Sequence, residues 1–456
     1  MTAVAEPSNA LAQVRALFGP SADIGLRRLV TGPKALDRLG ELVRETRRAG
    51  GPIVVLTDAT LKRAYGTDLT TAVLSRLDQP KPVVAGTPGH ATVADPATVA
   101  DAVARTAGAG VLVTLGSGTI SDIGKVAAAR NGLPHVVVQT AASVNGYAND
   151  HSVLLLNGVK TTVPSAWPDV LLIDEETLAG APPELTRAGF GDLISVYTGS
   201  ADWALAGELG VDHGYRPDLA RLLSGAATAV LPQAGALPGS AAAVAALAHG
   251  LTLGGLVMGM AGQTAPSSGT EHAISHLLDM AAGATGRPHA LHGAQVGVAA
   301  LVAAAIWDHL RARLTPSARV DVPEEAAARA RVLAAFAGLD PGGAMGERCW
   351  QGYAAKLRSL DAGTLTEFLT RWPAWADAAA PRLEALAGAL RQAGAPTRFS
   401  DLDPAANAER ARWAIATAPL LRARLGIADL AVVTGLWTEA DIDAVLDRLA
   451  RVGAGL

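Results

Sequence analysis

The sequence predicts an α/β nucleotide-binding domain with a parallel sheet, followed by an all-helical domain. Three observations lead to this fold class. The first part of the chain alternates short β-branched runs with helical segments, which is typical of a parallel sheet covered by helices. After residue 174 strand signals almost vanish, and helical periods rich in alanine and leucine continue to the end. A length of 456 residues suits two domains better than one core.

The expected elements follow one another in a strand–helix order. Pro52–Asp58 is a buried apolar run that ends in an acid, as expected of a central strand. Further strands are expected at 82–85, 111–115 and 134–140, and helices at 61–65, 96–107 and 121–130. Pro182-Pro183-Glu184 is typical of the first turn of a helix. We therefore expect a nucleotide-binding domain over 1–180 and a helical metal-binding and catalytic domain over 181–456.

The composition indicates a compact globular protein with a large buried core. Hydrophobic residues make up 50% of the chain and charged residues 18%, against a usual value of about 25% charged. The 38 basic and 42 acidic residues give a net charge of −4 without any run of like charges. The footprint expected for binding nucleic acid or an anionic membrane is therefore missing from the sequence.

The ends and the most apolar stretch bear on cellular location. Residues 1–20 show no basic region followed by an apolar one, so no signal peptide is expected and a cytoplasmic location is predicted. Residues 241–265 are long and apolar, but they include His249, Gln263 and four glycines between 250 and 259. A buried core helix is favoured over a membrane span. The single cysteine, Cys349, fits a reducing compartment.

A cluster of histidines predicts a metal site. His272, His276 and His292, out of ten histidines in the chain, span 21 residues of an apolar region. Two histidines four residues apart on a helix lie about 40° apart around the axis and about 6 Å along it, so both can reach one ion. The alternative for any single one is a core histidine with a hydrogen-bonding partner.

Asp192 offers the third ligand. It follows Gly189 and Gly191 in an apolar segment, where an unpaired carboxylate would be costly. A helix cap or a salt bridge is the alternative. Together with His272 and His292, it makes a set of one carboxylate and two imidazoles that suits a divalent first-row metal and leaves a position open for substrate.

The loop Gly116–Lys125 predicts a phosphate-binding turn. It reads Gly-Ser-Gly between an expected strand and an expected helix, where backbone amides and the helix dipole can hold a pyrophosphate. Serine at 121 departs from the GxGxxG fingerprint, and a simple tight connection is the alternative. Asp58, at a strand end, can accept hydrogen bonds from an adenosine ribose, which favours NAD over NADP; it can equally cap the next helix.

Several motifs, in this order, resemble one superfamily. They are GSGTISD from Gly116, TAAS from Thr140, AGAPPELTRAGFGD before Leu193, GTEHAISH from Gly269 and LHGAQVG from Leu291. This series is similar to the iron-containing alcohol dehydrogenase and dehydroquinate synthase-like superfamily. The GTEHxxxH form and the CWQGY segment from Cys349 resemble its sn-glycerol-1-phosphate dehydrogenase branch, especially the bacterial members. The resemblance runs from about residue 25 to near the C-terminus and implies a dehydroquinate synthase-like fold.

The resemblance implies a role for each matching position. The metal, zinc, nickel or iron, would be bound by Asp192, His272 and His292. The cofactor, NAD or NADP, would contact Asp58, Gly116, Ser117, Gly118, Asp122, Thr140 and Ser143, the last two on the nicotinamide side. His276 would contact substrate or relay a proton, with a supporting structural role as the alternative. Lys160 would bind a phosphate, with a solvated lysine as the alternative.

The chain departs from this pattern in the loop after Ser143. Asn145 stands where relatives usually have an aspartate that contacts substrate hydroxyls, and Asn149 stands where serine is common. An asparagine at 145 can still donate and accept hydrogen bonds, but it supplies no negative charge and cannot act as a base. We expect Asn145 to contact the substrate, and the change leaves the substrate more open than the reaction type.

The reaction implied is the NAD(P)H-linked reduction of dihydroxyacetone phosphate to sn-glycerol 1-phosphate, a step in phospholipid metabolism, by an enzyme that forms a homodimer or larger assembly. One alternative is a dehydrogenase of another phosphorylated or free ketone or aldehyde. A second is a sugar-phosphate cyclase, a lyase that usually has a glutamate ligand and several basic residues. A non-catalytic binding protein is the third.

Overall fold

The computed structural model describes residues 9–19, 24–61, 68–87 and 89–456. The chain forms two compact units. The first comprises 1–156, 161–189 and 236–263, and the second comprises 157–160, 190–235 and 264–456. The sequence places the division near residue 180, whereas the first unit continues to residue 189 and also takes in a later helical segment.

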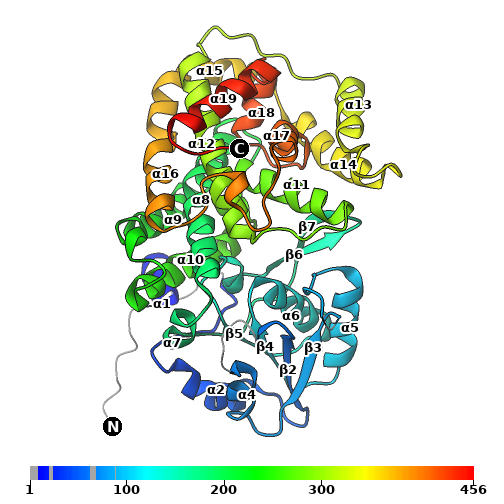
Figure 1. Cartoon of the computed structure of the whole chain (residues 1–456), viewed down its shortest axis with the longest axis vertical. Coiled ribbons are helices and arrows are strands. Elements are labelled where there is room, and N and C mark those ends of the chain that lie inside the picture. The colour runs from blue at the N-terminus through cyan, green and yellow to red at the C-terminus, as the bar shows by residue number, and fades with distance from the viewer. Residues whose placement is uncertain (1–8, 20–23, 62–67, 88) are drawn as a thin grey trace. The chain divides into compact units, whose positions relative to one another are not determined.

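A six-stranded parallel sheet forms the centre of the first unit, in the order β1-β8-β5-β4-β2-β3 (Figure 1). Its strands are β1 Arg28–Gly32, β2 Ile53–Asp58, β3 Lys81–Ala85, β4 Val111–Gly116, β5 His135–Gln139 and β8 Val170–Asp174. The helices of this unit are α1 Ala10–Phe18, α2 Leu39–Thr46, α4 Leu69–Leu74, α5 Pro96–Thr106, α6 Gly118–Asn131, α7 Glu175–Ala179 and α10 Ala241–Ala261. Short 3-10 turns are η1 Ala35–Arg38 and η2 Gly146–Ala148.

Both faces of this sheet are covered, because the strands are apolar on both sides. Val55 and Val113 face a core shared with α2 and α4. Their neighbours Leu56 and Leu112 face a second core shared with α5 and α6. Figure 1 shows these two helix pairs on different sides of the strands. Alternate side chains of each strand therefore serve opposite layers, as expected of a buried parallel sheet.

The strand order creates a switch point between β2 and β4. These two strands are neighbours, yet the chain leaves β2 toward β3 on one side and leaves β4 toward β5 on the other. Their carboxyl ends, at Asp58 and Gly116, lie at the same edge because the strands are parallel. In open α/β sheets this edge of a switch point is where ligands bind.

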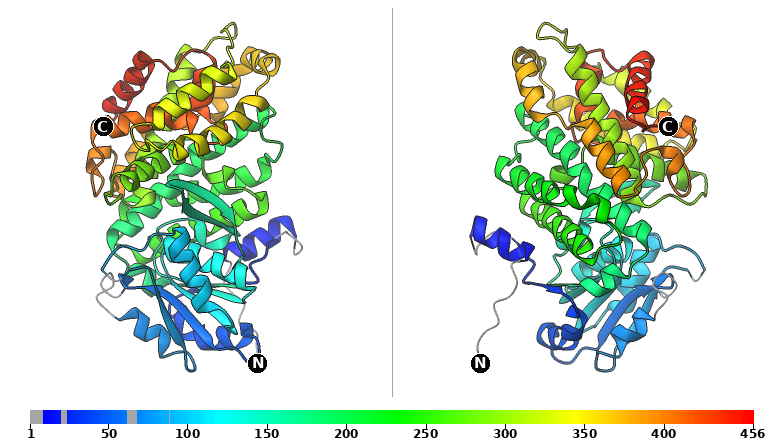
Figure 2. Two further views of the ribbon diagram at one scale, coloured as in Figure 1. Left: turned by 90° about the vertical axis from the view of Figure 1, so that its right-hand side faces the viewer. Right: turned by 60° about the vertical axis from the view of Figure 1, so that its left-hand side comes forward.

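The second unit is helical. Its elements are α8 Pro183–Glu208 (whose first turns belong to the first unit), α9 Pro217–Val230, η3 Leu231–Ala236, η4 Ala265–Ser267, α11 Thr270–Ala284, α12 His292–Arg313, α13 Glu325–Phe336, α14 Ala344–Ser359, α15 Ala362–Ala379, α16 Leu383–Gln392, η5 Phe399–Asp401, α17 Ala408–Thr417, η6 Ala418–Leu420, α18 Ile427–Val433 and α19 Glu439–Arg451. Helix α12 lies at its centre, in contact with α11, α15, α16, α18 and α19. Figure 2 shows these helices from two further directions.

Two helices, α10 and α12, are long and apolar enough to cross a membrane by length and composition alone. In the fold, 72% of the apolar window of α10 and 89% of that of α12 are buried. The glycines of α10 serve this packing: a Cβ at Gly255 would lie 2.5 Å from the carbonyl oxygen of Asn145. The expectation that 241–265 forms a core helix is confirmed.

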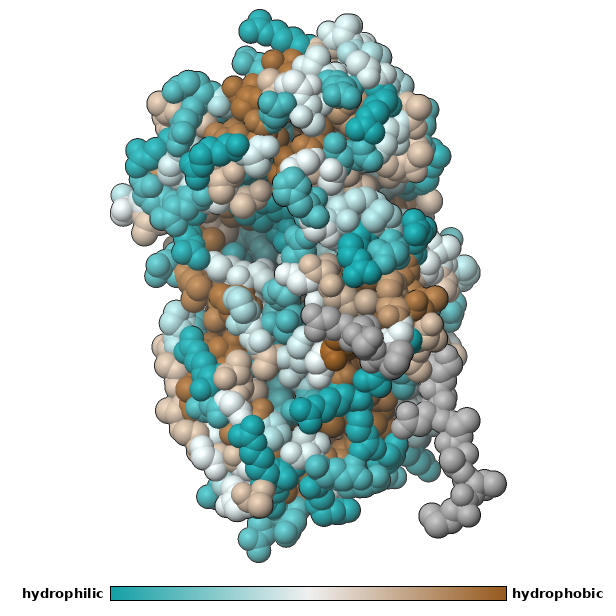
Figure 3. Space-filling model, turned by 180° about the vertical axis from the view of Figure 1, so that it is seen from behind, coloured by the Kyte–Doolittle hydropathy of each residue, from teal (hydrophilic) through white to brown (hydrophobic). Residues whose placement is uncertain are grey.

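The exterior carries few large apolar side chains among the described residues. The exposed ones are Leu17, Val84, Val93 and Leu291, which are far apart in the sequence. Figure 3 shows hydrophilic side chains interspersed with smaller apolar areas over one face. The apolar half of the composition is thus largely accounted for by the buried cores.

The sequence predicted four strands of the sheet, β2 to β5, including the edge strand β3, but missed β1 and the separate hairpin. β2, β3, β4 and β5 match the predicted runs within two residues at each end. β1 was not predicted, nor was the hairpin of β6 His151–Leu156 and β7 Val159–Pro164. Its turn has positive φ at both Asn157 (50°) and Gly158 (75°), as a type I′ turn requires. The helix predicted at 61–65 lies outside the described residues beyond Leu61.

Candidate metal and nucleotide sites

Asp192, His272 and His292 come together in the second unit. One ligand atom from each lies within 4.8 Å of the others, and Asp192 Oδ1 is 3.5 Å from His272 Nε2. Asp192 is 1% exposed and His272 is 6% exposed. A carboxylate oxygen and two imidazole nitrogens at this spacing are the donor set that a divalent first-row metal takes.

Glycine backbone contacts bring Asp192 to the histidines. Helix α8 carries Asp192, and α12 begins at His292. A Cβ at Gly191 would lie 2.2 Å from the carbonyl oxygen of Gly293, and one at Gly297 would lie 2.9 Å from the Cα of Gly191. The two helices can approach this closely only because these positions lack side chains. The glycines around Asp192 in the sequence therefore have a packing reason.

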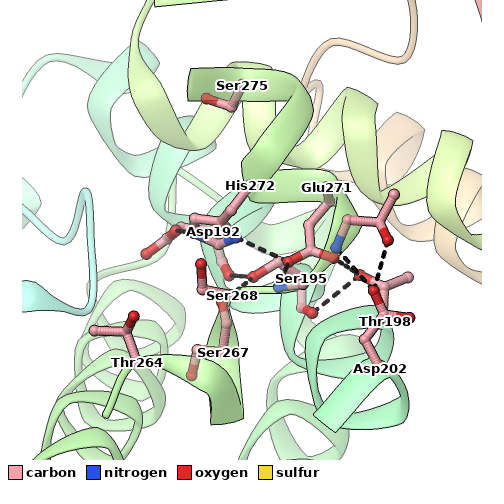
Figure 4. Close-up of polar contacts among 12 residues, drawn as sticks. Asp192, Ser195, Thr198, Asp202, Thr264, Ser267, Ser268, Glu271, His272 and Ser275 are labelled. Atoms are coloured by element: carbon pink, nitrogen blue, oxygen red, sulfur yellow. Dashed lines mark hydrogen bonds and ion pairs between the residues drawn. The ribbon is translucent and has the colours of Figure 1, made fainter. Parts of the chain in front are cut away.

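Glu271 holds His272 from the opposite side of the ring. Its Oε1 accepts from His272 Nδ1 at 2.9 Å, and its Oε2 accepts from the Thr198 hydroxyl at 2.8 Å. Because a carboxylate can only accept here, Nδ1 carries a proton, and the neutral ring that binds a metal therefore has its lone pair on Nε2. Figure 4 shows Asp192 and Glu271 on either side of His272. Such partners fix the ring orientation and the tautomer of a metal-binding histidine.

The start of α11 is held by Asp202. Its Oδ2 accepts from the backbone and hydroxyl of Thr270 at 2.8 and 2.7 Å, and its Oδ1 accepts from the indole of Trp307 at 3.2 Å. Asp202 is fully enclosed, since it is 1% exposed. The first turn of α11, which carries Glu271 and His272, is thereby fixed to α8 (Figure 4).

His292 is held through a hydroxyl rather than a carboxylate. Its Nδ1 lies 3.2 Å from Ser275 Oγ. Both candidate ligand histidines therefore have Nδ1 engaged by a neighbouring polar group, which leaves Nε2 for a metal. The residues present fit a divalent metal.

The electrostatic surroundings of the ligands differ. Burial lowers the pKa of His272, but the hydrogen bonds to Asp192 and Glu271 together raise it more, so its pKa lies above the usual value. Burial, and then the charge of Lys160, lower the pKa of His292 to about 3. The pKa of His276 lies well below its usual range through burial and then Lys160, His292 and Arg422.

His276 and Lys160 lie beside the ligand set. The ring centroid of His276 is 5.6 Å from that of His292 and 6.2 Å from that of His272. Lys160 Nζ lies 2.5 Å from Asp279 Oδ2, and its side chain is 21% exposed. The structure thus places Lys160 against a buried carboxylate instead of in open solvent. Arg422 donates to the carbonyl of Gly269 at 2.6 Å, next to the first turn of α11.

The glycine loop of the first unit leaves the start of α6 without a side-chain cap. Ser117 is the N-cap of α6 but makes no side-chain capping bond, so the first amides of α6 have no such partner. A Cβ at Gly116 would lie 2.7 Å from the Cβ of Ile120, and one at Gly118 would lie 2.9 Å from Val144. Asp122, one turn along α6, lies 3.3 Å from Lys125 Nζ.

The other predicted cofactor residues lie at or just past the carboxyl ends of neighbouring strands. Asp58 ends β2, and its Oδ1 accepts from the backbone amides of Thr60 and Leu61 at 2.8 and 3.0 Å, which is the capping arrangement. Thr140 directly follows β5 and is buried. Ser143 is also buried, 3.4 Å from the hydroxyl of Tyr147. The sheet therefore brings Asp58, Gly116 and Thr140 to one edge.

Asn149 is part of the framework of its loop. Lys125 is fully buried and donates to the carbonyl of Gly146 at 2.7 Å and to Asn149 Oδ1 at 3.0 Å. Burial lowers the pKa of Lys125, and the charge of Asp122 opposes this. Asn145, the N-cap of η2, lies in the same loop and is partly exposed. The change at 149 is thus accounted for by a contact to Lys125.

Sequence reasoning missed the residues that support the ligands. Glu271 and Ser275 stand inside the histidine motif and Gln295 stands inside the second one, so their position in buried polar motifs was the available signal. Asp279 and Arg422 had no local signal, because Arg422 reaches the site from more than 100 residues away along the chain.

The comparisons with known proteins place these observations in a family context. The family model described as iron-containing alcohol dehydrogenase matches residues 30–182. Glycerol-1-phosphate dehydrogenase [NAD(P)+] of Halorubrum lacusprofundi is 33% identical over 311 residues, 66% of this chain and 83% of that protein. The Bacillus subtilis protein of the same name is 31% identical over 282 residues, 61% of this chain and 71% of that protein. The Bacillus velezensis one is 37% identical, and the match spans 42% of this chain and about half, 49%, of that protein.

Solved structures share the fold. A probable glycerol dehydrogenase from Sinorhizobium meliloti superimposes with a TM-score of 0.59 at 17% identity, covering 94% of this chain and 98% of that one. Glycerol dehydrogenase from Schizosaccharomyces pombe superimposes with a TM-score of 0.56 at 16% identity, covering 94% and 89%. The expected dehydroquinate synthase-like class, a parallel sheet followed by a helical part, is confirmed.

Proposed function

Because the chain belongs to the glycerol-1-phosphate dehydrogenase family, among the iron-containing alcohol dehydrogenases, we propose that it reduces dihydroxyacetone phosphate to sn-glycerol 1-phosphate with NAD(P)H. The observation that carries this proposal is the buried cluster of Asp192, His272 and His292, whose ligand atoms lie within 4.8 Å of one another. The cluster supports chemistry at a carbonyl oxygen, which is the group that a ketone reduction must polarise.

Asp192, His272 and His292 would hold one divalent ion, zinc, nickel or iron. When bound, the metal supplies Lewis acidity toward the carbonyl oxygen, and the reduced nicotinamide supplies the hydride. Glu271 keeps His272 Nε2 directed at the cluster through its bond to Nδ1. The near-complete burial of Asp192 and His272 excludes water, which strengthens the electrostatic interactions inside the site.

Cationic groups beside the cluster support a phosphorylated substrate. The charge of Lys160 and that of Arg422 both lower the pKa of His276, so both act on the space around that ring. A phosphate dianion is stabilised by such a pair. We assign Lys160 to the phosphate, where Asp279, 2.5 Å from its ammonium, keeps the side chain in place before substrate arrives.

His276 and Asn145 would complete the substrate contacts. The ring centroids of His276 and His292 are 5.6 Å apart. We propose that His276 contacts a substrate hydroxyl and donates the proton that the new alcohol takes up. Asn145 would donate to or accept from a hydroxyl, since an amide has both capacities.

The glycine loop would hold the pyrophosphate of the cofactor. Gly116, Ser117 and Gly118 supply the close backbone approach, and the first turn of α6 supplies amides. Asp122 would border this turn, Thr140 and Ser143 would lie on the nicotinamide side, and Asp58 would accept from the adenosine ribose, which favours NAD over NADP. Hydride transfer then requires the nicotinamide ring to meet the substrate at the metal cluster.

The test is the oxidation of NADH and of NADPH across dihydroxyacetone phosphate, dihydroxyacetone and glyceraldehyde phosphate. The protein is first treated with a chelator, and zinc, nickel or iron is then added back. We expect turnover with dihydroxyacetone phosphate, its loss on chelation and its return with one of the metals. Turnover with no loss on exhaustive chelation would overturn the proposal.

A second candidate is a dehydrogenase of another phosphorylated or free ketone or aldehyde. Asn145 favours it, because the neutral amide replaces a carboxylate that contacts substrate hydroxyls in relatives. The same panel separates the two, since a higher kcat/KM on a compound other than dihydroxyacetone phosphate selects the second.

The proposal includes a cytoplasmic location and assembly as a homodimer or larger. Cell fractionation tests the first, and the mass measured by light scattering after size exclusion tests the second.

A further inference from the structure

We propose that Ser275, Gln295 and Asp279 form a directed hydrogen-bond chain that holds His292 in its metal-binding tautomer, with Lys160 at the outer end. The inference rests on the metal site of the proposed function. It assigns positioning roles to residues that do not touch the metal, and it joins the ligand His292 to the lysine assigned to phosphate.

The direction of the chain is set at Gln295. Its Nε2 lies 2.9 Å from Asp279 Oδ1 and 3.3 Å from the carbonyl oxygen of Ala290. A backbone carbonyl can only accept a hydrogen bond, and so can the Asp279 carboxylate. The other oxygen of that carboxylate lies 2.5 Å from the ammonium of Lys160. The NH₂ end of the amide must therefore face these two groups, and Oε1 must face Ser275, 2.9 Å away.

The hydroxyl of Ser275 then has only one arrangement. It carries a single proton, and Gln295 Oε1 can only accept, so that proton points to Gln295. Toward His292 the serine oxygen can therefore only accept, across the 3.2 Å separation from Nδ1. It follows that Nδ1 of His292 carries the ring proton and Nε2 carries a lone pair. That is the tautomer that can bind a metal through Nε2.

Burial makes the chain hard to replace. Ser275 is fully buried, Gln295 is 2% exposed and Asp279 is 4% exposed, so water has little access to the polar atoms. A broken link leaves a buried polar group without its hydrogen-bonding partner, which is unfavourable. Neither solvent nor a small side-chain movement restores the bond.

The two ligand histidines are thus held in different ways. Glu271 fixes His272 directly with a carboxylate, whereas His292 is fixed by neutral groups that end in the Lys160–Asp279 ion pair. Ser275 and Gln295, the neutral groups next to His292, add no negative charge beside the metal site. It also ties the position of Lys160 to that of a metal ligand.

The experiment measures the Kd for Co²⁺ of the metal-stripped full-length protein, without substrate, from the visible absorption of the bound ion. We expect Ser275→Ala to weaken binding by about 10–100-fold, as the loss of such supporting contacts does. Gln295→Met should weaken it by about tenfold. The double variant should bind no more weakly than Ser275→Ala, because a chain that is already broken gives non-additive effects.

Ser200→Ala is the matched control. Ser200 is also buried and also donates one hydrogen bond, to the carbonyl of Pro266 at 2.9 Å, but it contacts none of the ligands. Its Kd should match that of the unaltered protein. Equal Kd values for the unaltered protein and Ser275→Ala, with both folded by circular dichroism, would overturn the inference while leaving the metal site intact.

Two further outcomes would separate a failure of the hydrogen-bond chain from a failure of the proposed function. If Ser275→Ala fails to fold, Gln295→Met carries the test, and an unchanged Kd in that variant contradicts the chain. If the unaltered protein binds no Co²⁺, or binds it with a spectrum that His272→Ala leaves unchanged, the proposed function itself has failed.

Discussion

The glycine loop of the first unit and the histidine cluster of the second are built in opposite ways. The loop consists of backbone: Gly116 and Gly118 lack the Cβ atoms that would crowd Ile120 and Val144, and the first amides of α6 have no side-chain cap. The cluster consists of the side chains of Asp192, His272 and His292, and a neighbouring polar group contacts Nδ1 of each histidine. A backbone site is broken by adding atoms, whereas a side-chain site is broken by removing them.

Removing a ligand should have the largest effect. His272→Ala deletes one of three donors, and since metal polarisation contributes several kcal/mol to the transition state, we expect activity to fall about a thousandfold or more. Steady-state NADH oxidation measures this, with metal content by mass spectrometry. The control is His249→Ala, which loses a hydrogen bond to Gln13 and should keep both its activity and its metal content. If His272→Ala still binds metal and is active, His272 is not part of the metal site.

Adding an atom should break the loop. A Cβ at Gly116 would lie 2.7 Å from the Cβ of Ile120, so Gly116→Ala must displace the first turn of α6. Overpacking of this kind costs about 1–3 kcal/mol, and we expect the Kd for NADH to rise about tenfold or more while Co²⁺ binding is unchanged. Fluorescence titration measures the Kd for NADH. Gly225→Ala, with open space at its Cβ, is the control, and an unaltered Kd in Gly116→Ala would show that the loop does not hold the cofactor.

Removing a charge beside the cluster should change selectivity. Hydrogen bonds to charged groups contribute about 1.5–3 kcal/mol, so Lys160→Met should lower kcat/KM for dihydroxyacetone phosphate about 10–100-fold. The value for dihydroxyacetone, which has no phosphate, should change far less. Lys81→Met, at an exposed position on β3, should alter neither. If both substrates lose equally, Lys160 serves the framework and not the phosphate.

The smallest effect at neutral pH should come from a histidine in the sheet. Burial, and then the charge of Lys125, lower the pKa of His135 to about 3. Below about pH 6.5 the unfolded chain takes up a proton that the folded chain refuses, so stability falls as the pH drops toward 3, by about 2 kcal/mol between pH 6.5 and 5.

His135→Gln should remove that fall and leave activity at pH 7 nearly unchanged. Glutamine can keep a hydrogen bond to Thr114, whose hydroxyl lies 2.7 Å from the histidine ring. Urea unfolding at pH 7 and pH 5 measures the difference. His213→Gln, at an exposed position, is the control. An equally acid-sensitive His135→Gln would place the titrating group elsewhere.

The same contrast explains how far the sequence could predict the molecule. The loop is local in the chain, so a strand, two glycines and a helix predicted it directly. Asp192, His272 and His292 were predicted as candidate ligands because histidines and an acid are rare in apolar segments, and the structure brings the three together. Glu271, Ser275 and Gln295 stood in those motifs, but their roles depend on which atoms face each other. Arg422 could not be predicted, because only the packing of the helical unit brings it near Gly269.

Ketone reduction should depend on a metal that Asp192, His272 and His292 bind together. The most direct measurement is the metal content per chain, made on the same samples as dihydroxyacetone phosphate-dependent NADH oxidation, for the unaltered protein, Asp192→Ala and His292→Ala. We predict that the unaltered protein contains one divalent ion per chain and is active. Asp192→Ala and His292→Ala should fold but contain no bound metal and show no activity. Full activity in metal-stripped protein would show that the reaction needs no metal. An unchanged metal content in both variants would show that these residues do not bind it.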